Sequence, residues 1–278
     1  MSSCWYRRLL WSGVHIPWVA AGLLAGNAAL LQIPLSKPLL VLEATGAWVV
    51  YLLDRALNIG PEDLVNQPER VAWWRRQQKL LRGGLAIAGL LIGWAALHVQ
   101  ASTLVAGAGL GLIGLLYMLP GVRLKQWGIA KPILIAGTWS LGTTLLLPLE
   151  AGRALGANLW LLTGYRLLWI LPNPLLADWP DRQGDRVAGI RTPAVRWNYK
   201  TLRNGALLLL LGALSIGLIL IIRLGRAEAA IDLMGVLCSG MLIMASRAEP
   251  SEVQLIILDL LLCWPVFTML ALTLSRSL

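Results

Sequence analysis

Nine stretches of apolar residues run through the chain, and each is long enough, or nearly so, to cross a lipid bilayer. They cover residues 9–33, 38–57, 83–99, 101–120, 131–149, 156–177, 203–223, 229–246 and 253–274. A transmembrane helix needs about 20 predominantly apolar residues, and somewhat fewer when neighbouring helices shield its ends. Because several connections are only a few residues long, consecutive segments must form antiparallel hairpins. The sequence therefore predicts an all-α, polytopic membrane protein with nine transmembrane helices.

Composition points the same way. Hydrophobic residues make up 57% of the 278 positions and charged residues only 14%, whereas a soluble domain carries about 25% charged residues. The 14 Trp and 5 Tyr, against a single Phe, are typical of side chains at bilayer interfaces. Three scattered cysteines form no CxxC pair, so neither a disulfide framework nor a zinc site is expected. The first apolar stretch lacks a small-residue cleavage site, so we interpret it as a helix and not as a removed signal peptide.

The net charge of +10 is distributed unevenly between the two sides of the predicted bundle. With a cytoplasmic N-terminus, 18 of the 24 lysines and arginines fall on the cytoplasmic side, five on the opposite side, and Arg166 inside a span. Cytoplasmic loops carry an excess of Lys and Arg, so this bias predicts the orientation. The basic excess is then explained by topology, and nucleic-acid binding is not expected. We expect a multi-pass integral protein, as in a bacterial inner membrane, with the N-terminus in the cytoplasm.

Two regions on the predicted cytoplasmic side, residues 51–82 and 178–200, hold half of the 14 acidic residues. In the second region Asp178, Asp181 and Asp185 have the spacing i, i+3, i+7. On a helix such residues lie within about 60° of one another, where like charges repel unless a cation holds them. Mg²⁺ is typically bound by a few carboxylates together with substrate phosphates. The spacing therefore indicates a magnesium site.

Other residues of the second region qualify this interpretation. Pro180 can kink or end a helix, because it lacks an N–H group. Gly184 and Gly189 allow tight turns or a close approach of two backbones. The alternative is a solvated acidic loop whose charge is balanced by basic residues, here Arg182, Arg186 and Arg191.

The first region carries a weaker pattern. Tyr51, Asp54 and Asn58 share one helix face, but they supply a single carboxylate beside a phenol and an amide. Taken alone, Asp54 and Arg55 fit an ion pair at a helix end equally well.

At these two regions the chain resembles a known family, the UbiA superfamily of intramembrane prenyltransferases. Residues 178–192 read D-x-x-D-x-x-G-D-x-x-x-G-x-x-T, which resembles the second aspartate-rich motif of that family in its acids, glycines and threonine. The opening motif of the family, N-D-x-x-D-x-x-x-D, is matched only in part. Val50 and Tyr51 stand where Asn and the first Asp belong, Asp54 matches, and Asn58 replaces the last Asp.

Two further segments extend the likeness over most of the chain. Pro68-Glu69-Arg70 resembles the P-x-R that follows the first motif, after a longer insertion, and Tyr117 through Lys125 resembles the tyrosine–lysine stretch of the next cytoplasmic loop. The resemblance implies a single UbiA-like transmembrane domain over residues 1–278, with nine helices around a central cavity. It also implies that the two Asp-rich regions face each other across that cavity and hold Mg²⁺ on a prenyl diphosphate.

The resemblance also assigns roles to residues. It implies that the catalytic acids are Asp54, Asp178, Asp181 and Asp185, and that the same four, with Asn58, are the metal ligands. The substrate-binding residues that we expect are Arg55, Asn58, Arg70, Tyr117, Lys125, Asn173 and Arg182. The partners implied are a prenyl diphosphate, a hydrophobic or aromatic acceptor, and membrane lipid; no protein partner is indicated. The expected reaction is Mg²⁺-dependent transfer of the prenyl group to the acceptor.

The degenerate first motif keeps an alternative open. Two of its three acids are replaced, and the number of charged ligands is a main determinant of divalent-ion affinity. The alternative is a catalytically silent UbiA-like membrane subunit that binds a lipid or an isoprenoid pigment, or that scaffolds a complex.

Four polar residues inside the apolar stretches remain. An intramembrane Arg usually faces a polar cavity or a partner, so we expect Arg166 to face the cavity, toward an acceptor or Asp259; the alternative is snorkelling or a polar helix contact. Asp259 itself is either a cavity acid or half of a buried pair. We expect Asn173 to line the cavity. The alternative is that it hydrogen-bonds backbone groups left unpaired by Pro172 and Pro174. For the isolated His15 we expect an interfacial or satisfied polar contact.

Overall fold

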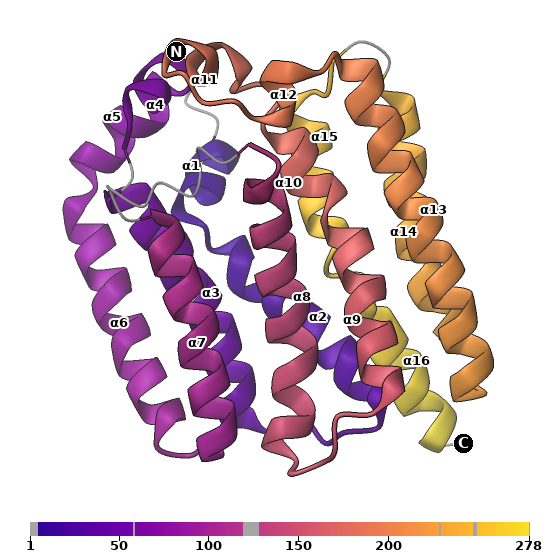
Figure 1. The fold of residues 1–278 in the computed structure, drawn as a ribbon. Coiled ribbons are helices and arrows are strands. Elements are labelled where there is room, and N and C mark those ends of the chain that lie inside the picture. The colour runs from indigo at the N-terminus through magenta and orange to yellow at the C-terminus, as the bar shows by residue number, and fades with distance from the viewer. Residues whose placement is uncertain (1–4, 58, 119–127, 228, 247–248, 278) are drawn as a thin grey trace.

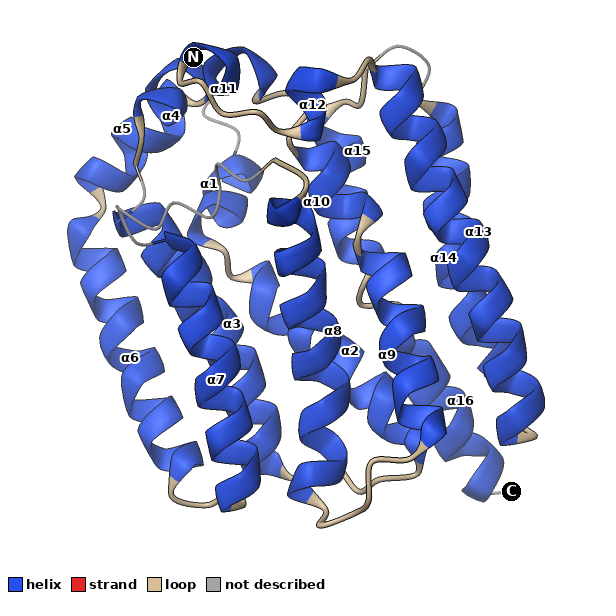
Figure 2. Ribbon diagram, in the orientation of Figure 1, coloured by secondary structure: helices blue, strands red, loops and turns tan. Residues whose placement is uncertain are grey.

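The computed structural model describes residues 5–57, 59–118, 128–227, 229–246 and 249–277. Within these ranges every regular element is a helix and no strand occurs, as Figure 2 shows. The described helices are α1 Trp5–Ser12, α2 His15–Leu31, α3 Lys37–Leu57, α4 Pro61–Asn66, α5 Pro68–Arg76, α6 Gln78–Ala96, α7 Ala101–Met118, α8 Ala130–Glu150, α9 Ala157–Ile170, α10 Pro172–Ala177, α11 Arg182–Val187, α12 Pro193–Arg196, α13 Tyr199–Leu224, α14 Ala229–Ala245, α15 Glu252–Leu261 and α16 Pro265–Ser277. The prediction of an all-α protein is confirmed.

The long helices run side by side, and the short helices α4, α5, α11 and α12 gather at one end of the bundle (Figure 1). By length and composition, four helical segments of the described chain can cross a membrane: α6, α8, α13 and the joined α15–α16, Glu252–Ser275. The apolar helices α2, α7 and α14 are shorter. Each of the nine predicted stretches coincides with a long helix or a broken pair of helices, but the number of nine spans stays a prediction.

Three of the stretches predicted as single helices are broken, and the breaks have local causes. Gly13, at φ +68, separates α1 from α2. Pro172 is the first residue of α10 and Pro265 is the first residue of α16. A proline has no N–H to continue the preceding helix but fits the first turn of a new one. These breaks give the short helices α10 and α15, both of which reach the site described below.

The outer faces of the bundle are apolar. Leu90 on α6 is 76% exposed and Ile222 on α13 is 80% exposed, and many other large apolar side chains are exposed as well. In water such faces would be unfavourable, whereas in lipid they need no cover. Inside, the main apolar core packs α9, α13 and α14 around side chains such as Trp169 and Leu210.

A fully buried ion pair ties four helices together away from the short helices. Arg166 on α9 donates to both oxygens of Asp232 on α14, at 2.6 and 3.2 Å. Its Nε donates to Asn27 Oδ1 on α2 at 2.7 Å, and Thr268 on α16 donates to Asp232 at 3.2 Å. The expectation that Arg166 faces Asp259 or an acceptor is therefore wrong. The acid that neutralises it lies on α14, and neither Arg166 nor Asp232 lines the cavity described next.

Candidate active site

A cavity of about 450 Å³ opens among α2, α3, α7, α8, α10 and α15, below the short helices. One part of its wall is apolar and includes Ile16, Val50, Trp139, Ile170 and Leu262. The other part is polar and draws side chains from both Asp-rich regions; its members are Asp54, Arg55, Glu62, Asp63, Asn66, Gln67, Arg70, Tyr117, Lys131, Asp178, Asp181 and Asp185. Residues 54–70 and 178–185 of the two regions, more than 100 residues apart in sequence, therefore share one chamber.

The second Asp-rich region reaches the cavity through a broken helix. The prediction that its three aspartates share one helix face is wrong, because α10 ends at Ala177 and α11 begins at Arg182, with Pro180 between them. All three carboxylates nevertheless line the cavity. Asp178 and Asp185 are only 4% and 5% exposed. Thr192, the last residue of the motif, donates to Asp185 Oδ2 at 3.3 Å.

The glycines of this motif do what their positions predict. Gly189 adopts φ +73, in the left-handed region that L side chains rarely occupy. Gly184 packs against the side chain of Asn66, and a Cβ there would lie 2.5 Å from its amide atoms. Any side chain at residue 184 would push the two regions apart.

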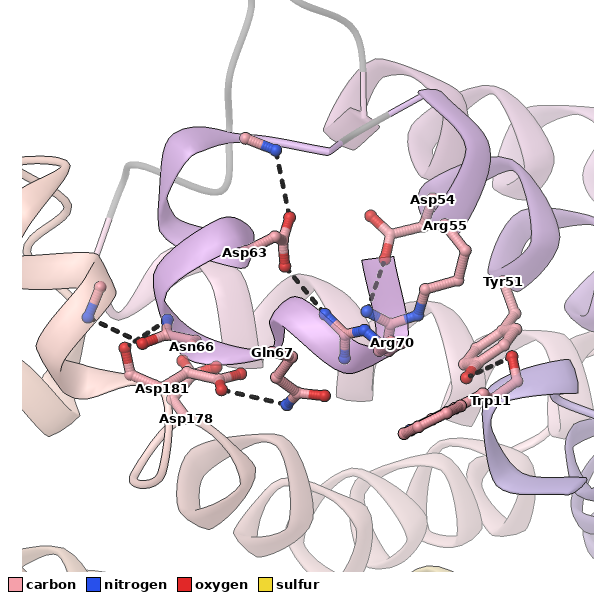
Figure 3. A network of polar contacts seen from close by, with 12 residues as sticks. Trp11, Tyr51, Asp54, Arg55, Asp63, Asn66, Gln67, Arg70, Asp178 and Asp181 are labelled. Atoms are coloured by element: carbon pink, nitrogen blue, oxygen red, sulfur yellow. Dashed lines mark hydrogen bonds and ion pairs between the residues drawn. The ribbon is translucent and has the colours of Figure 1, made fainter. Parts of the chain in front are cut away.

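In the first region, Asp54 and Arg55 both line the cavity. Arg55 lies 3.9 Å from the Asp54 carboxylate, and its guanidinium stacks over the Tyr51 ring at 4.9 Å (Figure 3). The Tyr51 hydroxyl donates to the backbone carbonyl of Leu10 at 3.0 Å. Tyr51, which stands where the family motif has an acid, therefore contributes a hydrogen-bonded ring to the wall and no charge.

The two regions are joined through α4 and the residue that follows it. Asn66 donates to the carbonyl of Asp181 at 2.7 Å and accepts from the Gly184 N–H at 2.8 Å (Figure 3). Gln67 donates to the Asp181 carboxylate at 3.1 Å. Arg70 forms an ion pair with Asp63 at 2.8 Å. Asn66 and Gln67, which lie in sequence between the predicted site residues Asp54 and Arg70, thus set the distance between the two halves of the site.

Tyr117 of α7 and Lys131 of α8 also line the cavity. The Lys131 ammonium is hydrogen-bonded to Asp178 Oδ1. The other oxygen of that carboxylate, Oδ2, is buried and has no hydrogen-bond partner among the described residues. Lys131 is therefore a basic group inside the site.

Burial perturbs the titration of the groups outside the helical spans. It raises the pKa of Asp185 to about 6, although Lys131 opposes the shift. It also raises the pKa of Asp178, again against the effect of Lys131. Burial and the neighbouring Arg55 together lower the pKa of Arg70. Such shifts mean that charge is held here at a cost in solvation, which an oppositely charged ligand would offset.

The donor set fits Mg²⁺ in kind. Carboxylate and amide oxygens are the ligands that this ion prefers, and the lone Oδ2 of Asp178 offers an unfilled position. In the described part of the chain, however, no three His, Cys, Asp or Glu side chains are already assembled as a metal site. The candidates to hold the ion are Asp178, Asp181 and Asp185 on one side and Asp54 and Asp63 on the other.

Not every expected residue is found in the site. Arg182 does not line the cavity; its guanidinium pairs with Glu249 at 2.6 Å and stacks over Trp179 at 4.3 Å. Asn58 and Lys125 lie outside the described residues. Asn173 does line the cavity, where it donates to Asp259.

Sequence reasoning did not identify Asp63, Asn66, Gln67 and Lys131 as site residues. A signal for the first three was present, because they lie between Asp54 and Arg70 in a region already marked by its acids. Lys131 occupies the first position of a predicted span, where a lysine is ordinarily explained by the interface. Its pairing with Asp178 could be recognised only in the folded structure.

Comparison with known proteins gives a family match. The model of the UbiA prenyltransferase family matches residues 71–254, about two thirds of the chain. The matched range includes Asp178 through Thr192 but not Asp54 through Arg70. The interpretation of the first region therefore depends on the local motif and on the cavity.

Among curated proteins, the chain is 30% identical over 146 residues to chloroplastic chlorophyll synthase of Arabidopsis thaliana. It is 27% identical over 191 residues to homogentisate phytyltransferase of Synechocystis sp.. The alignments cover 51% and 60% of this chain but only 35% and 59% of those relatives.

Among solved structures, an apo UbiA homolog from Aeropyrum pernix K1 matches with a TM-score of 0.65 and 14% identity, over 95% of this chain and 99% of that one. A UbiA homolog from Archaeoglobus fulgidus bound to DMAPP and Mg²⁺ also matches with a TM-score of 0.65, at 13% identity, over 92% and 96% of the two chains. At such identities the likeness is one of fold.

Proposed function

The chain belongs to the UbiA prenyltransferase family, and from this we propose that it moves a prenyl group from a prenyl diphosphate to a hydrophobic or aromatic acceptor within the membrane, with Mg²⁺. One observation carries the proposal. A single cavity joins a polar end, lined by aspartates from both Asp-rich regions and by Arg and Lys, to an apolar wall. A diphosphate with a hydrocarbon tail needs both environments at once.

The roles follow from charge. Asp54, Asp178, Asp181 and Asp185, with Asp63, would hold Mg²⁺, which when bound neutralises charge on the leaving diphosphate. A second set would contact the phosphates or orient the substrate: Arg55, Arg70, Tyr117, Lys131 and, from the sequence alone, Asn58 and Lys125. The apolar wall would take the prenyl tail and exclude water from the reacting carbon. What the curated relatives' names describe, chlorophyll synthesis and phytyl transfer to homogentisate, supports this reaction class without naming the acceptor here.

A specific observation favours a second function. No three acids of the described chain are preassembled for a metal, and Lys131 already pairs with Asp178. Together with Tyr51 in place of an acid, this supports a silent membrane subunit that binds a lipid or isoprenoid pigment, or that scaffolds a complex.

Binding and turnover separate these two functions. Purified protein in liposomes receives radiolabelled geranylgeranyl or farnesyl diphosphate, with Mg²⁺ or with EDTA, and bound label and released diphosphate are measured. Mg²⁺-dependent binding followed by release in the presence of an acceptor supports the transferase. Binding without release over a panel of acceptors supports the silent subunit. A complete lack of Mg²⁺-dependent binding contradicts prenyl transfer and also any silent subunit that binds a prenyl diphosphate.

The proposal includes the orientation in the membrane. The short helices that carry the two Asp-rich regions lie at one end of the bundle, and the basic residues concentrate there in the sequence. We place this end and the N-terminus in the cytoplasm of a bacterial cell, with nine spans below. Single cysteines at Arg75 and at Arg153, labelled from outside in intact cells, should differ. Only the cysteine at residue 153 should react with an impermeant reagent, and labelling of residue 75 would reverse the orientation.

A further inference from the structure

A second polar cluster borders the cavity, apart from the Asp-rich end. It is made of Asp259 on α15 and Asn173 on α10, which line the cavity, and of His15 at the start of α2, which lies beside Asp259. Asn173 donates its amide N–H to Asp259 Oδ1, and Nε2 of His15 lies 4.0 Å from Oδ2 of the same carboxylate. The three residues come from three helices that are distant in sequence, so the cluster is a product of the fold.

The cluster lies deeper in the bundle than the aspartates. Asn173 precedes Asp178 by five residues, which at 1.5 Å per residue is about 7 Å along the helix direction. Around it the wall is apolar, with Ile16, Ile170 and Leu262. This separation is suited to a second reactant, which must meet the reacting carbon of the donor from the side away from the diphosphate.

The cluster has unused hydrogen-bonding capacity. The Asp259 side chain is 45% exposed, and the residue lines the cavity. Its Oδ2 is beyond hydrogen-bond distance of His15, and Nδ1 of His15 is buried with no partner in the part of the chain that the structure describes. The contact expected for His15 is therefore present but unsatisfied. The Asp259 carboxylate faces a cavity at this depth and can accept a further hydrogen bond. Such an acid indicates a ligand site more than a structural pair.

We propose that Asp259 binds the acceptor, through a hydrogen bond that the acceptor's O–H or N–H donates to Oδ2, with Asn173 and His15 positioning the carboxylate. This deepens, and rests on, the proposed prenyl transfer. The acceptor heteroatom forms a bond to C1 of the prenyl group as the bond from C1 to the diphosphate oxygen breaks. The electron pair of that bond leaves with the diphosphate, and the acceptor's proton passes to Asp259. The acceptor class is a phenol, an alcohol or an amine; an ionised carboxylate at this point would be repelled.

The test uses two matched probes that differ only in their donors: methylhydroquinone and its dimethyl ether. Their binding to the full chain in liposomes is measured by equilibrium dialysis and corrected with protein-free liposomes. A hydrogen bond to a charged group corresponds to about a tenfold preference or more for the hydroquinone. Asp259→Leu should remove the preference, and Asn173→Ala should reduce it. Glu150→Gln, a matched loss of a carboxylate outside the cavity, should keep it.

The outcomes of this test can be distinguished from the outcomes that test the proposed prenyl transfer. Asp259→Leu should still bind geranylgeranyl diphosphate with Mg²⁺, since residue 259 is not among the proposed metal and phosphate ligands; this also shows that the variant is folded. Equal binding of the two probes by the wild type, or an undiminished preference in Asp259→Leu and Asn173→Ala, would overturn the acceptor site even if diphosphate binding is normal. A preference for the hydroquinone that depends on Asp259, in a protein that binds no prenyl diphosphate, would support the ligand site but overturn prenyl transfer.

Discussion

Two buried ion pairs of this bundle, Arg166–Asp232 and Lys131–Asp178, have the same chemistry but different surroundings. The side chains of Arg166 and Asp232 are 0% and 3% exposed, and both carboxylate oxygens accept from the guanidinium. The side chains of Lys131 and Asp178 are 22% and 6% exposed, and one oxygen of Asp178 has no partner within the described ranges. The first pair is closed on all sides by helices, whereas the second borders a cavity.

The difference teaches how to separate structural from functional charge in a membrane protein. Burial alone does not distinguish the pairs, because both are removed from bulk solvent. What distinguishes the two pairs is whether every hydrogen-bonding group of the pair already has a partner. A satisfied pair fixes how helices pack, and losing one partner strands the other charge in a medium that cannot solvate it. An incompletely satisfied pair next to a cavity can exchange its partner for a ligand.

The largest expected effect is on the closed pair. Asp232→Leu leaves the Arg166 guanidinium buried without its counter-charge, which should lower the free energy of unfolding by about 3–5 kcal/mol. Denaturant unfolding in detergent micelles measures the loss. The double variant Arg166→Met/Asp232→Leu replaces the pair by apolar groups and should recover most of the stability. Wild-type stability in the single variant would mean that the pair does not hold the helices together.

The next effect concerns the open end. Asp181→Ala should abolish Mg²⁺-dependent binding of geranylgeranyl diphosphate, raising Kd by about 100-fold or more, because a proposed metal ligand is lost. Its stability should fall by only about 1 kcal/mol, since the carboxylate accepts one described hydrogen bond, from Gln67. Filter binding with and without EDTA measures the first quantity, and His15→Ala is the control that should bind normally. Normal binding by Asp181→Ala would refute the site assignment.

A third variant changes the open pair itself. Lys131→Met removes the cation that now neutralises Asp178, so divalent metal alone should bind about tenfold more tightly. Inorganic diphosphate at saturating metal should bind about tenfold more weakly, because a phosphate contact is lost. Mn²⁺ titration followed by electron paramagnetic resonance and dialysis of labelled diphosphate give the two constants. If metal binding weakened instead, Lys131 would be a support for the metal site and not a competitor.

The smallest effect is expected where α4 meets α11. Asn66→Ala removes two hydrogen bonds between the Asp-rich regions, to the Asp181 carbonyl and from the Gly184 N–H. Loosening by about 1–2 kcal/mol should raise the Kd for prenyl diphosphate about tenfold. Gln67→Ala, which removes one bond, should change it only a few-fold. An effect of Gln67→Ala that exceeds that of Asn66→Ala would mean that Asn66 does not set the distance between the regions.

Much of the fold could be predicted because its signals are local. Apolar stretches are contiguous, and the spacing of Asp178, Asp181 and Asp185 is contained in eight residues. The ion-pair partner of Arg166 could not be predicted in this way, because it depends on contacts between segments distant in sequence. Both Asp232 and Asp259 lie in apolar segments, and nothing in their neighbours tells which one neutralises Arg166; helix packing decides it.

In the first Asp-rich region, Asp54, Arg55 and Arg70 line the cavity as expected. The family spacing directed attention to Asn58, which lies outside the described residues, and passed over Asp63, the acid that pairs with Arg70. Asp63 also accepts from the Gly60 N–H at 3.2 Å, so it helps to start the helix that carries it. A motif spacing indicates only the positions that it contains, and Asp63 is not among them.

The bond between Asn66 and Asp181 also has a consequence for biosynthesis. Its two ends are separated by 115 residues, so at about 5–20 residues per second the ribosome needs roughly 6–23 s to produce the second after the first. Throughout that interval the nascent first half carries its site charges without the other half. Asp63 and Arg70, only seven positions apart, can neutralise each other as soon as both have emerged. The first half of the chain thus supplies its own counter-ion before the rest is inserted, in a pair that the finished fold keeps.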